Sequence, residues 1–508
     1  MTNSTATSSS HGVDAHPNGT PGGDEARVVD AVRTGLFIGG SWRPAASGAT
    51  LTVDDPSTGT ALCEVANAGP ADGLDALTAA AATQSSFAAM APRERGEILR
   101  RAYDVIMDRI DDLALLMTLE MGKPVAEAKG EITYAAEFFR WFSEEAVRID
   151  GGYAVAPNGA SRFLVQRQPV GVCLLITPWN FPMAMGTRKI GPAIAAGCSM
   201  VLKPASQTPL TMHALAAILA EVGLPDGVLN LVTTSDAGGV MEPLIRDGRA
   251  RKLSFTGSTP TGRLLLEQAA EKVLRTSMEL GGNAPFLVFD DADLDAAVEG
   301  AMLAKMRNMG EACTAANRFL VHRRVAGPFA DRLAERMGAL TVGRGTEKGV
   351  QVGPLIDAKG RDKVVELVGD ALDRGAAVRV GAEPMAGPGF FYPPTVLTGV
   401  PRDARLAHEE IFGPVAAITV FDDENEAVAT ANDTTFGLVS YLYTENLTRA
   451  LRVSERLETG MIGLNTGLVS NPAAPFGGVK QSGLGREGGS VGIEEFLETK
   501  YVAIGFGG

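Results

Sequence analysis

From Gly171 onward the sequence alternates between short apolar runs and longer stretches with helical periodicity. Strands that are apolar along their whole length are buried on both faces, and intervening helices supply the crossovers of a parallel sheet. The pattern therefore predicts an α/β fold with a parallel sheet between two helical layers. The apolar runs are V-C-L-L-I-T, S-M-V-L-K-P, V-L-N-L-V-T-T and K-L-S-F-T-G, and the helical stretches are 184–196, 209–222 and 237–246.

A second α/β run begins near Glu279, and residues 72–147 before the first run show helical periodicity. Residues 153–157 and 161–168 are expected to form a hairpin across the turn P-N-G-A. The last residues, L-E-T-K-Y-V-A-I-G, are expected to form a terminal strand. One apolar side on this hairpin indicates an edge for association with other subunits.

Chain length, net charge and the lack of long apolar segments restrict the number of domains, the binding partners and the location that we expect. A chain of 508 residues predicts two or more domains. A net charge of −14 argues against nucleic acid, which calls for a basic face. The N-terminus lacks a secretory pattern, and no apolar stretch is long enough to span a membrane, so a cytoplasmic location is expected.

Cysteine usage does not indicate a disulfide framework, because only four cysteines occur and none forms a C-x-x-C pair. Cys173 and Cys198 lie in apolar segments and are expected to be buried, unreactive thiols. The five histidines do not cluster, so no metal site is expected. His322 lies in a strand-like segment, which disfavours a cysteine–histidine hydrolase without excluding it.

Three polar residues suggest acyl chemistry. Cys313 lies in the polar, glycine-flanked loop M-G-E-A-C-T, where reactive thiols are found. Glu279 in M-E-L-G-G-N could activate the water that hydrolyses a thioester. Asn180, held between two prolines in T-P-W-N-F-P, could donate to an oxyanion together with the Cys313 backbone N–H. Each residue alone could equally be structural.

Two segments suit a dinucleotide. Gly257, Ser258 and Gly262 in F-T-G-S-T-P-T-G follow a strand and open a helix, where backbone N–H groups can bind phosphate. Lys203 and Ser206 in K-P-A-S-Q-T-P follow another strand, and open α/β sheets bind ligands at strand carboxyl ends. Neither segment is a G-x-G-x-x-G fingerprint.

Together these segments resemble the aldehyde dehydrogenase superfamily over residues 32–507. The motifs occur in the family's order: T-P-W-N-F-P, K-P-A-S-Q-T-P, F-T-G-S-T-P-T-G, M-E-L-G-G-N, G-E-A-C, H-E-E-I-F-G-P and P-F-G-G-V-K-Q-S-G. The resemblance implies a homodimer or homotetramer. It also implies a Rossmann-type cofactor domain (31–149 and 170–279), an α/β catalytic domain (280–485) and a hairpin and terminal-strand oligomerisation element (150–169 and 486–508). Residues 1–30, rich in Ser, Thr, Gly, Asp and Pro, are expected to form a disordered tail.

Carried over position by position, the resemblance makes Cys313 the nucleophile, Glu279 the hydrolytic base and Asn180 the oxyanion donor. Lys189 would assist proton movement near the base. Glu410 would hold the nicotinamide ribose, and Phe412 would pack near the nicotinamide. The implied cofactor contacts are Thr177, Pro178, Trp179, Lys203, Ser206, Gly257, Ser258, Gly262, Glu410 and Phe412.

Within the superfamily the likeness is greatest to NADP-dependent succinate-semialdehyde dehydrogenases, which act in GABA catabolism. Arg188, Arg307 and Ser470 match that subfamily's carboxylate-binding residues, and an arginine fork suits a carboxylate. The implied reaction converts succinate semialdehyde to succinate through a Cys313 thiohemiacetal and thioester. Glutarate semialdehyde or a broader range of aldehydes is the alternative. Ser206 replaces a glutamate of NAD-preferring relatives, so NADP is expected to be preferred and NAD to be possible.

The sequence departs from the family pattern twice near the nucleophile. The usual G-Q-x-C is G-E-A-C here, so Glu311 adds an acid, which is expected to point into a helix contact. Ala315 stands where some relatives carry a second cysteine, so a disulfide between those two positions is not expected. The rival hypotheses are a coenzyme A-acylating dehydrogenase, a noncatalytic relative and a cysteine hydrolase.

Overall fold

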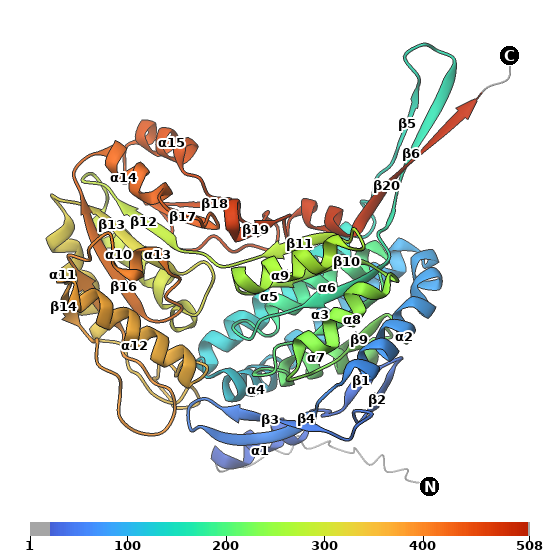
Figure 1. The fold of residues 1–508 in the computed structure, drawn as a ribbon, viewed down its shortest axis with the longest axis horizontal. Helices are drawn as coiled ribbons and strands as arrows, with labels where there is room; N and C mark the ends of the chain where they lie inside the picture. Colours follow the sequence, from blue (N-terminus) through green and yellow to red (C-terminus); the bar gives the residue numbers. More distant parts are fainter. Residues whose placement is uncertain (1–20, 506–508) are drawn as a thin grey trace, which may run out of the picture.

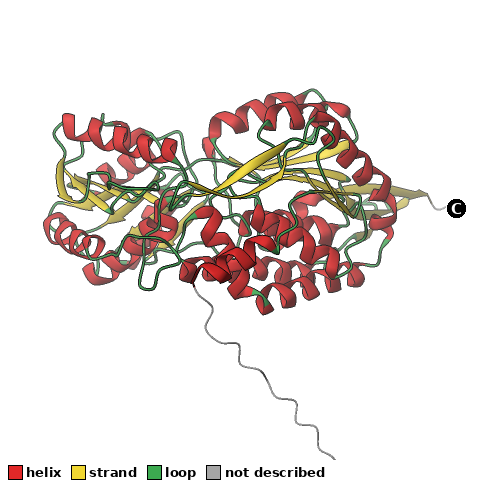
Figure 2. Cartoon of the chain, turned by 90° about the horizontal axis from the view of Figure 1, so that it is seen from below, coloured by secondary structure: helices red, strands yellow, loops and turns green. Residues whose placement is uncertain are grey.

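The computed structural model describes residues 21–505, in which two α/β units lie side by side. A narrow three-stranded arm projects from the first unit (Figure 1). Helices lie on both sides of the strands when the chain is seen from below (Figure 2). Within residues 21–505, no helix has the length and apolarity needed to cross a membrane. The α/β architecture that the sequence predicts is confirmed.

The first unit is built on an eight-stranded sheet in the order β19-β11-β10-β7-β8-β9-β1-β2, and its central strands run parallel. The strands are β1 (Leu36–Ile38), β2 (Ser41–Arg43), β7 (Val172–Ile176), β8 (Met200–Lys203), β9 (Leu229–Leu231), β10 (Ala250–Thr256), β11 (Arg275–Glu279) and β19 (Gly483–Leu484). The helices are α2 (Pro70–Ala89), α3 (Pro92–Asp108), α4 (Ile110–Met121), α5 (Val125–Glu145), α6 (Ala184–Ala196), α7 (Leu210–Glu221), α8 (Ala237–Asp247) and α9 (Thr259–Ala270).

Alternate residues of β7 point to opposite helical layers, as the period of a strand requires. Cys173 and Leu175 pack in the core beneath α3, α5, α6 and α7, whereas Leu174 packs in the core beneath α2, α8 and α9. Both strand faces are therefore buried. The continuous apolar run of β7 follows from this double burial, and Cys173 and Cys198 are buried as expected.

The second unit contains a seven-stranded sheet in the order β14-β15-β16-β13-β12-β17-β18, parallel except at β14. Its strands are β12 (Ala284–Val288), β13 (Ala316–His322), β14 (Ala377–Val380), β15 (Thr395–Thr398), β16 (Val415–Phe421), β17 (Val439–Tyr443) and β18 (Met461–Leu464). Its helices are α10 (Leu294–Met306), α11 (Ala326–Gly338), α12 (Ala358–Asp373), α13 (Arg405–His408), α14 (Glu424–Asn432) and α15 (Leu447–Arg456).

The arm joins the predicted hairpin to the predicted terminal strand. β5 (Gly152–Val155) pairs with β6 (Ser161–Pro169), and β20 (Leu497–Gly505) pairs with β6 in antiparallel register. The arm exposes Tyr153 and Tyr501. Its role in oligomerisation stays a prediction. The remaining elements are the hairpin of β3 (Thr50–Asp55) and β4 (Thr60–Ala66) and the short helical turns η1 (Arg307–Gly310), η2 (Lys480–Ser482) and η3 (Ser490–Phe496).

Two predicted boundaries are wrong. Residues 21–30 form helix α1 (Pro21–Asp30) rather than disordered tail, because Val28 and Val29 are buried and Arg27 pairs with Asp112 of α4 at 2.7 Å. Residues 1–20 lie outside the described residues. Strand β19 falls within the predicted catalytic domain, yet it pairs with β11 of the first sheet. The chain therefore returns to the first unit before residue 485.

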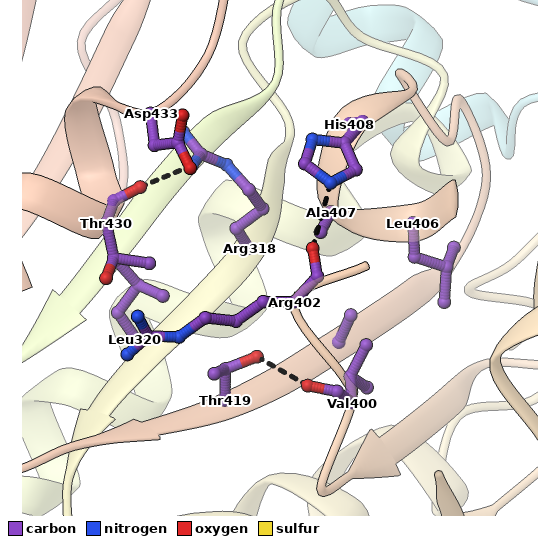
Figure 3. A pocket seen from close by; sticks show the side chains of 11 residues that line it. Arg318, Leu320, Val400, Arg402, Leu406, Ala407, His408, Thr419, Thr430 and Asp433 are labelled. Carbon is purple, nitrogen blue, oxygen red and sulfur yellow. Dashed lines mark hydrogen bonds between the residues drawn. The ribbon is translucent and has the colours of Figure 1, made fainter. Parts of the chain in front are cut away.

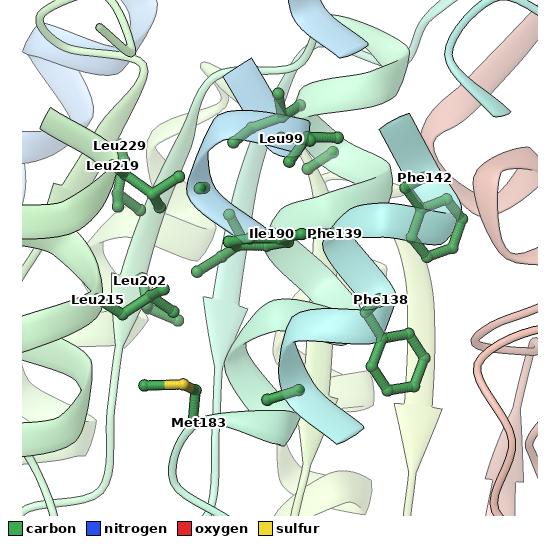
Figure 4. Packing of buried hydrophobic residues seen from close by; sticks show 14 of the residues in the cluster. Leu99, Phe138, Phe139, Phe142, Met183, Ile190, Leu202, Leu215, Leu219 and Leu229 are labelled. Atoms are coloured by element: carbon green, nitrogen blue, oxygen red, sulfur yellow. The ribbon is translucent and has the colours of Figure 1, made fainter. Parts of the chain in front are cut away.

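Aromatic packing between α5 and α6 sets the position of the helix that borders the site (Figure 4). Phe138, Phe139 and Phe142 of α5 are fully buried, and burying each side chain is worth roughly 1.5–3 kcal/mol. Gly191 of α6 permits the close approach, since a Cβ there would lie 3.1 Å from the Phe142 ring. This contact fixes the rotation of α6 and hence the direction of its basic residues.

Candidate active site

A cavity of about 860 Å³ lies between the two units and is lined by residues from both. Its size is in the range of small-molecule and cofactor sites. Both sheets contribute the loops that follow their strands, as open α/β folds do at ligand sites. Predicted site residues in the lining are Pro178, Trp179, Asn180, Arg188, Gly257, Ser258, Glu279, Cys313, Glu410 and Phe412.

Cys313 lies in the cavity on the loop between η1 and β13. The preceding residues Asn308 and Met309 have left-handed φ values of 56° and 54°, a costly conformation for non-glycine residues that turns the chain sharply. The thiol is partly accessible from the cavity. Burial raises its pKa to about 12, with Arg188 opposing the increase and Glu410 adding to it. The free protein therefore holds a protonated thiol at neutral pH.

Asn180 lies in the turn between β7 and α6, and its side chain points at the Cys313 loop. Its Nδ2 donates to the carbonyl of Glu311 at 2.9 Å, which leaves the second N–H of the amide available. The backbone carbonyl of Asn180 accepts hydrogen bonds from Lys123 Nζ at 2.9 Å and from Asn308 Nδ2 at 3.0 Å. The residue is thus held both at its side-chain amide and at its backbone carbonyl, beside the loop that carries Cys313.

A buried ion pair supports this turn, and the sequence analysis missed it. Lys123 and Glu131 are fully buried and paired through Nζ and Oε2. Glu131 Oε1 also accepts the backbone N–H groups of Met183 at 3.0 Å and Ala184 at 3.2 Å, at the start of α6. One carboxylate therefore caps the helix while its partner lysine holds the Asn180 carbonyl.

Glu279 ends β11 and is buried in the cavity wall, where its Oε2 has no hydrogen-bond partner among the described residues. Burial raises its pKa well above the usual range, and the nearby Glu487 carboxylate adds to the increase. Arg188 and Lys189 oppose it. A buried carboxyl with a raised pKa suits a general base.

Glu487 is a second functional candidate that sequence reasoning missed. Its Oε1 accepts a hydrogen bond from Lys189 Nζ at 2.5 Å, and Lys189 also donates to Ser254 Oγ at 2.9 Å. Its Oε2 lies 2.9 Å from Arg188 Nε, as an ion pair without hydrogen-bond alignment. In the sequence G-L-G-R-E-G, this glutamate has no feature other than its charge that would mark it as a site residue. Its contact with α6 arises only when the chain folds.

The predicted carboxylate clamp is divided between the cavity and its border. The Arg188 guanidinium lies over the Phe476 ring at 4.0 Å, and its Nη2 has no partner within residues 21–505. Arg307 lies over the Phe181 ring at 4.8 Å and donates to Ser470 Oγ at 3.2 Å. The fold therefore brings Arg307 and Ser470 together, although only Arg188 lines the cavity.

On the opposite wall, Glu410 and Phe412 define a short segment after α13. Glu410 Oε1 accepts the Gly282 N–H at 3.1 Å, and Lys363 Nζ donates to the Glu410 carbonyl at 2.6 Å. Burial raises the pKa of Glu410 to about 7. Phe412, with φ of 57°, makes an edge-to-face contact with Trp179 at 5.4 Å between ring centroids.

The predicted phosphate-binding segment opens α9, with Ser258 as its N-cap. The Gly257 N–H is already used, because it donates to the Glu279 carbonyl at 3.0 Å. Gly262 serves packing, since a Cβ there would lie 2.4 Å from the Leu280 side chain. Of the three predicted residues, Gly257 and Ser258 reach the cavity and Gly262 stays behind it.

Lys203, Ser206 and Thr177 lie just outside the cavity lining, whereas the neighbouring Gln207 is part of it. Thr177 N–H donates to the Lys203 carbonyl at 3.1 Å, which places both residues at the carboxyl ends of β7 and β8. Burial lowers the pKa of Lys203 to about 8. A phosphate beside the ammonium group would favour its charged form.

A smaller cavity of about 50 Å³ in the second unit is structural (Figure 3). Arg318 lines it, and its guanidinium donates to the carbonyls of Asn283, Thr430 and Ala431 at 3.0, 2.9 and 2.8 Å. These bonds tie β13 to the last turn of α14. Because the backbone carbonyls engage each of its nitrogens, Arg318 has little left to offer a ligand.

A family model described as the aldehyde dehydrogenase family matches residues 42–502. A succinate-semialdehyde dehydrogenase from Paenarthrobacter nicotinovorans is 59% identical over 443 residues, covering 87% of this chain and 98% of that protein. A glutarate-semialdehyde dehydrogenase from Pseudomonas aeruginosa is 50% identical, covering 93% of this chain and 98% of that protein. The crystal structure of an NADP-dependent enzyme from E. coli superposes with a TM-score of 0.92 at 50% identity, covering 94% of this chain and 99% of that chain.

Proposed function

Because this chain belongs to the aldehyde dehydrogenase family, we propose that it oxidises succinate semialdehyde to succinate, with NADP⁺ as the preferred hydride acceptor. Like its family, the protein is an oxidoreductase that uses a nicotinamide cofactor. The observation that carries the substrate proposal is the Arg188 guanidinium, whose Nη2 is unpartnered among the described residues of the cavity that also contains Cys313. A carboxylate at one end of a short aldehyde would satisfy this nitrogen.

The cavity residues fit a nicotinamide dinucleotide. Ser258 at the N-terminus of α9 offers a phosphate site, and Glu410 offers a carboxylate for ribose hydroxyls. Lys203 and the neutral Ser206 favour a 2′-phosphate, so we propose NADP⁺ as the preferred form and NAD⁺ as a weaker alternative. The bound cofactor supplies the hydride acceptor of the reaction. Phe412 and Trp179 form an aromatic wall that suits a nicotinamide ring.

Cys313 begins the chemistry by losing its proton and attacking the aldehyde carbon. The Asn180 amide N–H and the Cys313 backbone N–H then donate to the oxygen that becomes negative, which stabilises the thiohemiacetal. Hydride loss from that carbon leaves a thioester on Cys313. The raised pKa of the thiol requires that its proton be removed as the sulfur attacks, and water in the open cavity can accept that proton without Glu279.

Glu279 completes the reaction as a general base. It removes a proton from the water that attacks the thioester, and the product is released as a dicarboxylate with Cys313 restored as a thiol. Lys189 and Glu487, hydrogen-bonded at 2.5 Å beside Glu279, give the proton a route away from the site. Because an enzyme that transfers the acyl group to coenzyme A needs no hydrolytic base, Glu279 favours the release of free acid.

Glutarate semialdehyde is the second candidate substrate, favoured by the 50% identity to the Pseudomonas aeruginosa relative. One additional methylene changes affinity by only about 1–3 kcal/mol, so both aldehydes can enter one pocket. The proposal is tested by comparing kcat/KM for succinate semialdehyde, glutarate semialdehyde and an uncharged aldehyde, each with NADP⁺ and with NAD⁺. Equal kcat/KM for charged and uncharged aldehydes would overturn the carboxylate clamp.

We extend the proposal to the oligomeric state, the cellular location and the metabolic role of the enzyme. The exposed Tyr153 and Tyr501 of the arm support association into a homodimer or homotetramer through that element. A cytoplasmic role in GABA catabolism accords with the proposed substrate. Light scattering of the purified protein, with and without residues 497–508, would test the assembly.

A further inference from the structure

Glu311 connects the nucleophile loop to the opposite wall of the cavity. Its Oε1 accepts the backbone N–H of Ile356 at 3.1 Å, and Ile356 directly precedes Asp357, the N-cap of α12. Its own carbonyl accepts the side-chain amides of Asn180 and Asn308, both at 2.9 Å. The residue therefore lies where three segments meet, two positions before Cys313.

The contact with Ile356 leads onward to the cofactor wall. Asp357 caps α12 through the Gly360 N–H at 2.7 Å, and Lys363 of the same helix donates to the Glu410 carbonyl at 2.6 Å. A hydrogen-bonded path thus runs from Glu311 through the start of α12 to Glu410. Glu311 was expected to point into a helix contact, and its hydrogen bond is instead to Ile356, two residues before the first residue of α12.

We propose that Glu311 is a positioning residue that holds α12, and through it the Glu410 segment, against the nucleophile loop, so that cofactor affinity depends on whether its carboxyl is ionised. The proposal rests on the proposed function only in taking the cavity as the nicotinamide site. In this proposal Glu311 acts neither as the nucleophile nor as the base.

The surroundings of the Glu311 side chain explain why ionisation of its carboxyl would affect the contact with Ile356. The carboxyl is 1% exposed, and its Oε2 has no partner in the described part of the chain. Burial raises its pKa well above the usual range and the Asp357 carboxylate raises it further, whereas the hydrogen bond from the Ile356 N–H and the Lys123 ammonium oppose the increase. Glu127, which accepts the Asn308 N–H, is a half-buried acid close to this loop.

The sign of the pH effect follows from this burial. At lower pH the protonated carboxyl keeps the Ile356 bond without a buried charge. As pH rises through the raised pKa, the ionised Oε2 would be buried without a donor, which favours turning the carboxylate toward cavity water and releasing Ile356. NADP⁺ affinity should therefore fall toward alkaline pH.

The test measures the NADP⁺ dissociation constant by calorimetry across a series of buffers from about pH 6 to about pH 9, on both sides of neutrality. Glu311→Gln keeps the acceptor and removes the charge, so NADP⁺ binding should match wild type at low pH and lose the alkaline weakening. Glu311→Leu also removes the acceptor and should weaken binding about 3- to 10-fold at every pH. Glu335→Gln, on the surface of α11, is the charge-matched control and should keep the wild-type profile.

Identical pH profiles for wild type and Glu311→Gln would overturn the proposal, as would full affinity in a folded Glu311→Leu variant. Glu311→Gln keeps the test decisive if Glu311→Leu does not fold. Because calorimetry needs no aldehyde, these results do not depend on substrate identity. An enzyme that binds NADP⁺ but oxidises no semialdehyde would overturn the proposed function and leave the Glu311 inference standing.

Discussion

The Glu487 carboxylate lies 2.9 Å from the Arg188 guanidinium, and the pair is almost completely buried. The other oxygen of the same carboxylate accepts a hydrogen bond from Lys189. One acid therefore joins the proposed substrate clamp to the proposed proton route. It also faces Glu279, whose pKa its charge helps to raise.

Replacing Glu487 by glutamine should lower the pKa of Glu279, because one of the two causes that raise it is a negative charge. The acidic limb of the kcat profile should then move to lower pH, while KM for the semialdehyde rises as Arg188 loses its partner. Glu487→Asp, which keeps the charge, is the control and should leave the limb close to its wild-type position. An acidic limb that does not move in Glu487→Gln would refute the electrostatic link.

Replacing Glu279 by glutamine should separate the two halves of the reaction. Rapid mixing with NADP⁺ and aldehyde should still give one burst of NADPH per active site, because acylation of Cys313 continues. Steady-state turnover should fall about 10²- to 10⁴-fold, since water lacks its base. A Cys313→Ser variant serves as the control and should give no burst. If Glu279→Gln lost the burst as well, Glu279 would be needed before hydrolysis, and its role would have to be revised.

The residues that the sequence predicted lie within short motifs. Asn180, Glu279 and Cys313 each come from a segment whose spacing and turn residues already restrict the backbone, and the fold brings all three to one cavity. The strand and helix order was predictable for a similar reason. Long apolar runs have few alternatives once both faces of a sheet must be buried.

The supporting residues could not be predicted, because their roles depend on contacts between distant segments. Glu487 is separated from Lys189 by 298 positions, and Lys123 from Asn180 by 57. A buried lysine in M-G-K-P looks like any surface lysine until its partner is known. Helix α1 was missed for the same reason, since its small apolar side, Val28 and Val29, is stabilised only by packing against the folded chain.

Lys123 should affect catalysis through Asn180. Lys123→Met removes the donor to the Asn180 carbonyl and leaves Glu131 unpaired, so kcat should fall while KM for NADP⁺ stays near wild type. Asn180→Ala should lower kcat about 10²- to 10³-fold, as expected for the loss of an oxyanion donor. If both act through one group, the double variant should be little worse than Asn180→Ala. Simple additivity of the two losses would contradict this coupling.

The carboxylate clamp can be tested by selectivity. Arg188→Met and Arg307→Met should each reduce kcat/KM for succinate semialdehyde about 10-fold or more, because charge-assisted hydrogen bonds contribute about 1.5–3 kcal/mol. An uncharged aldehyde of similar length should be affected much less. Ser470→Ala should have a smaller effect of the same kind, through Arg307. Equal losses for charged and uncharged aldehydes would indicate damage to the fold instead of a lost clamp.

The choice of cofactor should depend on Ser206, which lies beside the end of β8 without a charge of its own. In Ser206→Glu, a carboxylate would accept the ribose hydroxyls of NAD⁺ and repel the 2′-phosphate of NADP⁺. The NAD⁺/NADP⁺ ratio of kcat/KM should therefore rise about 10-fold or more. Ser206→Gln, similar in size but neutral, should shift the ratio much less. Lys203→Met should weaken NADP⁺ more than NAD⁺, because only NADP⁺ brings a phosphate to the ammonium group. An unchanged ratio in Ser206→Glu would mean that this side chain does not reach the adenosine ribose.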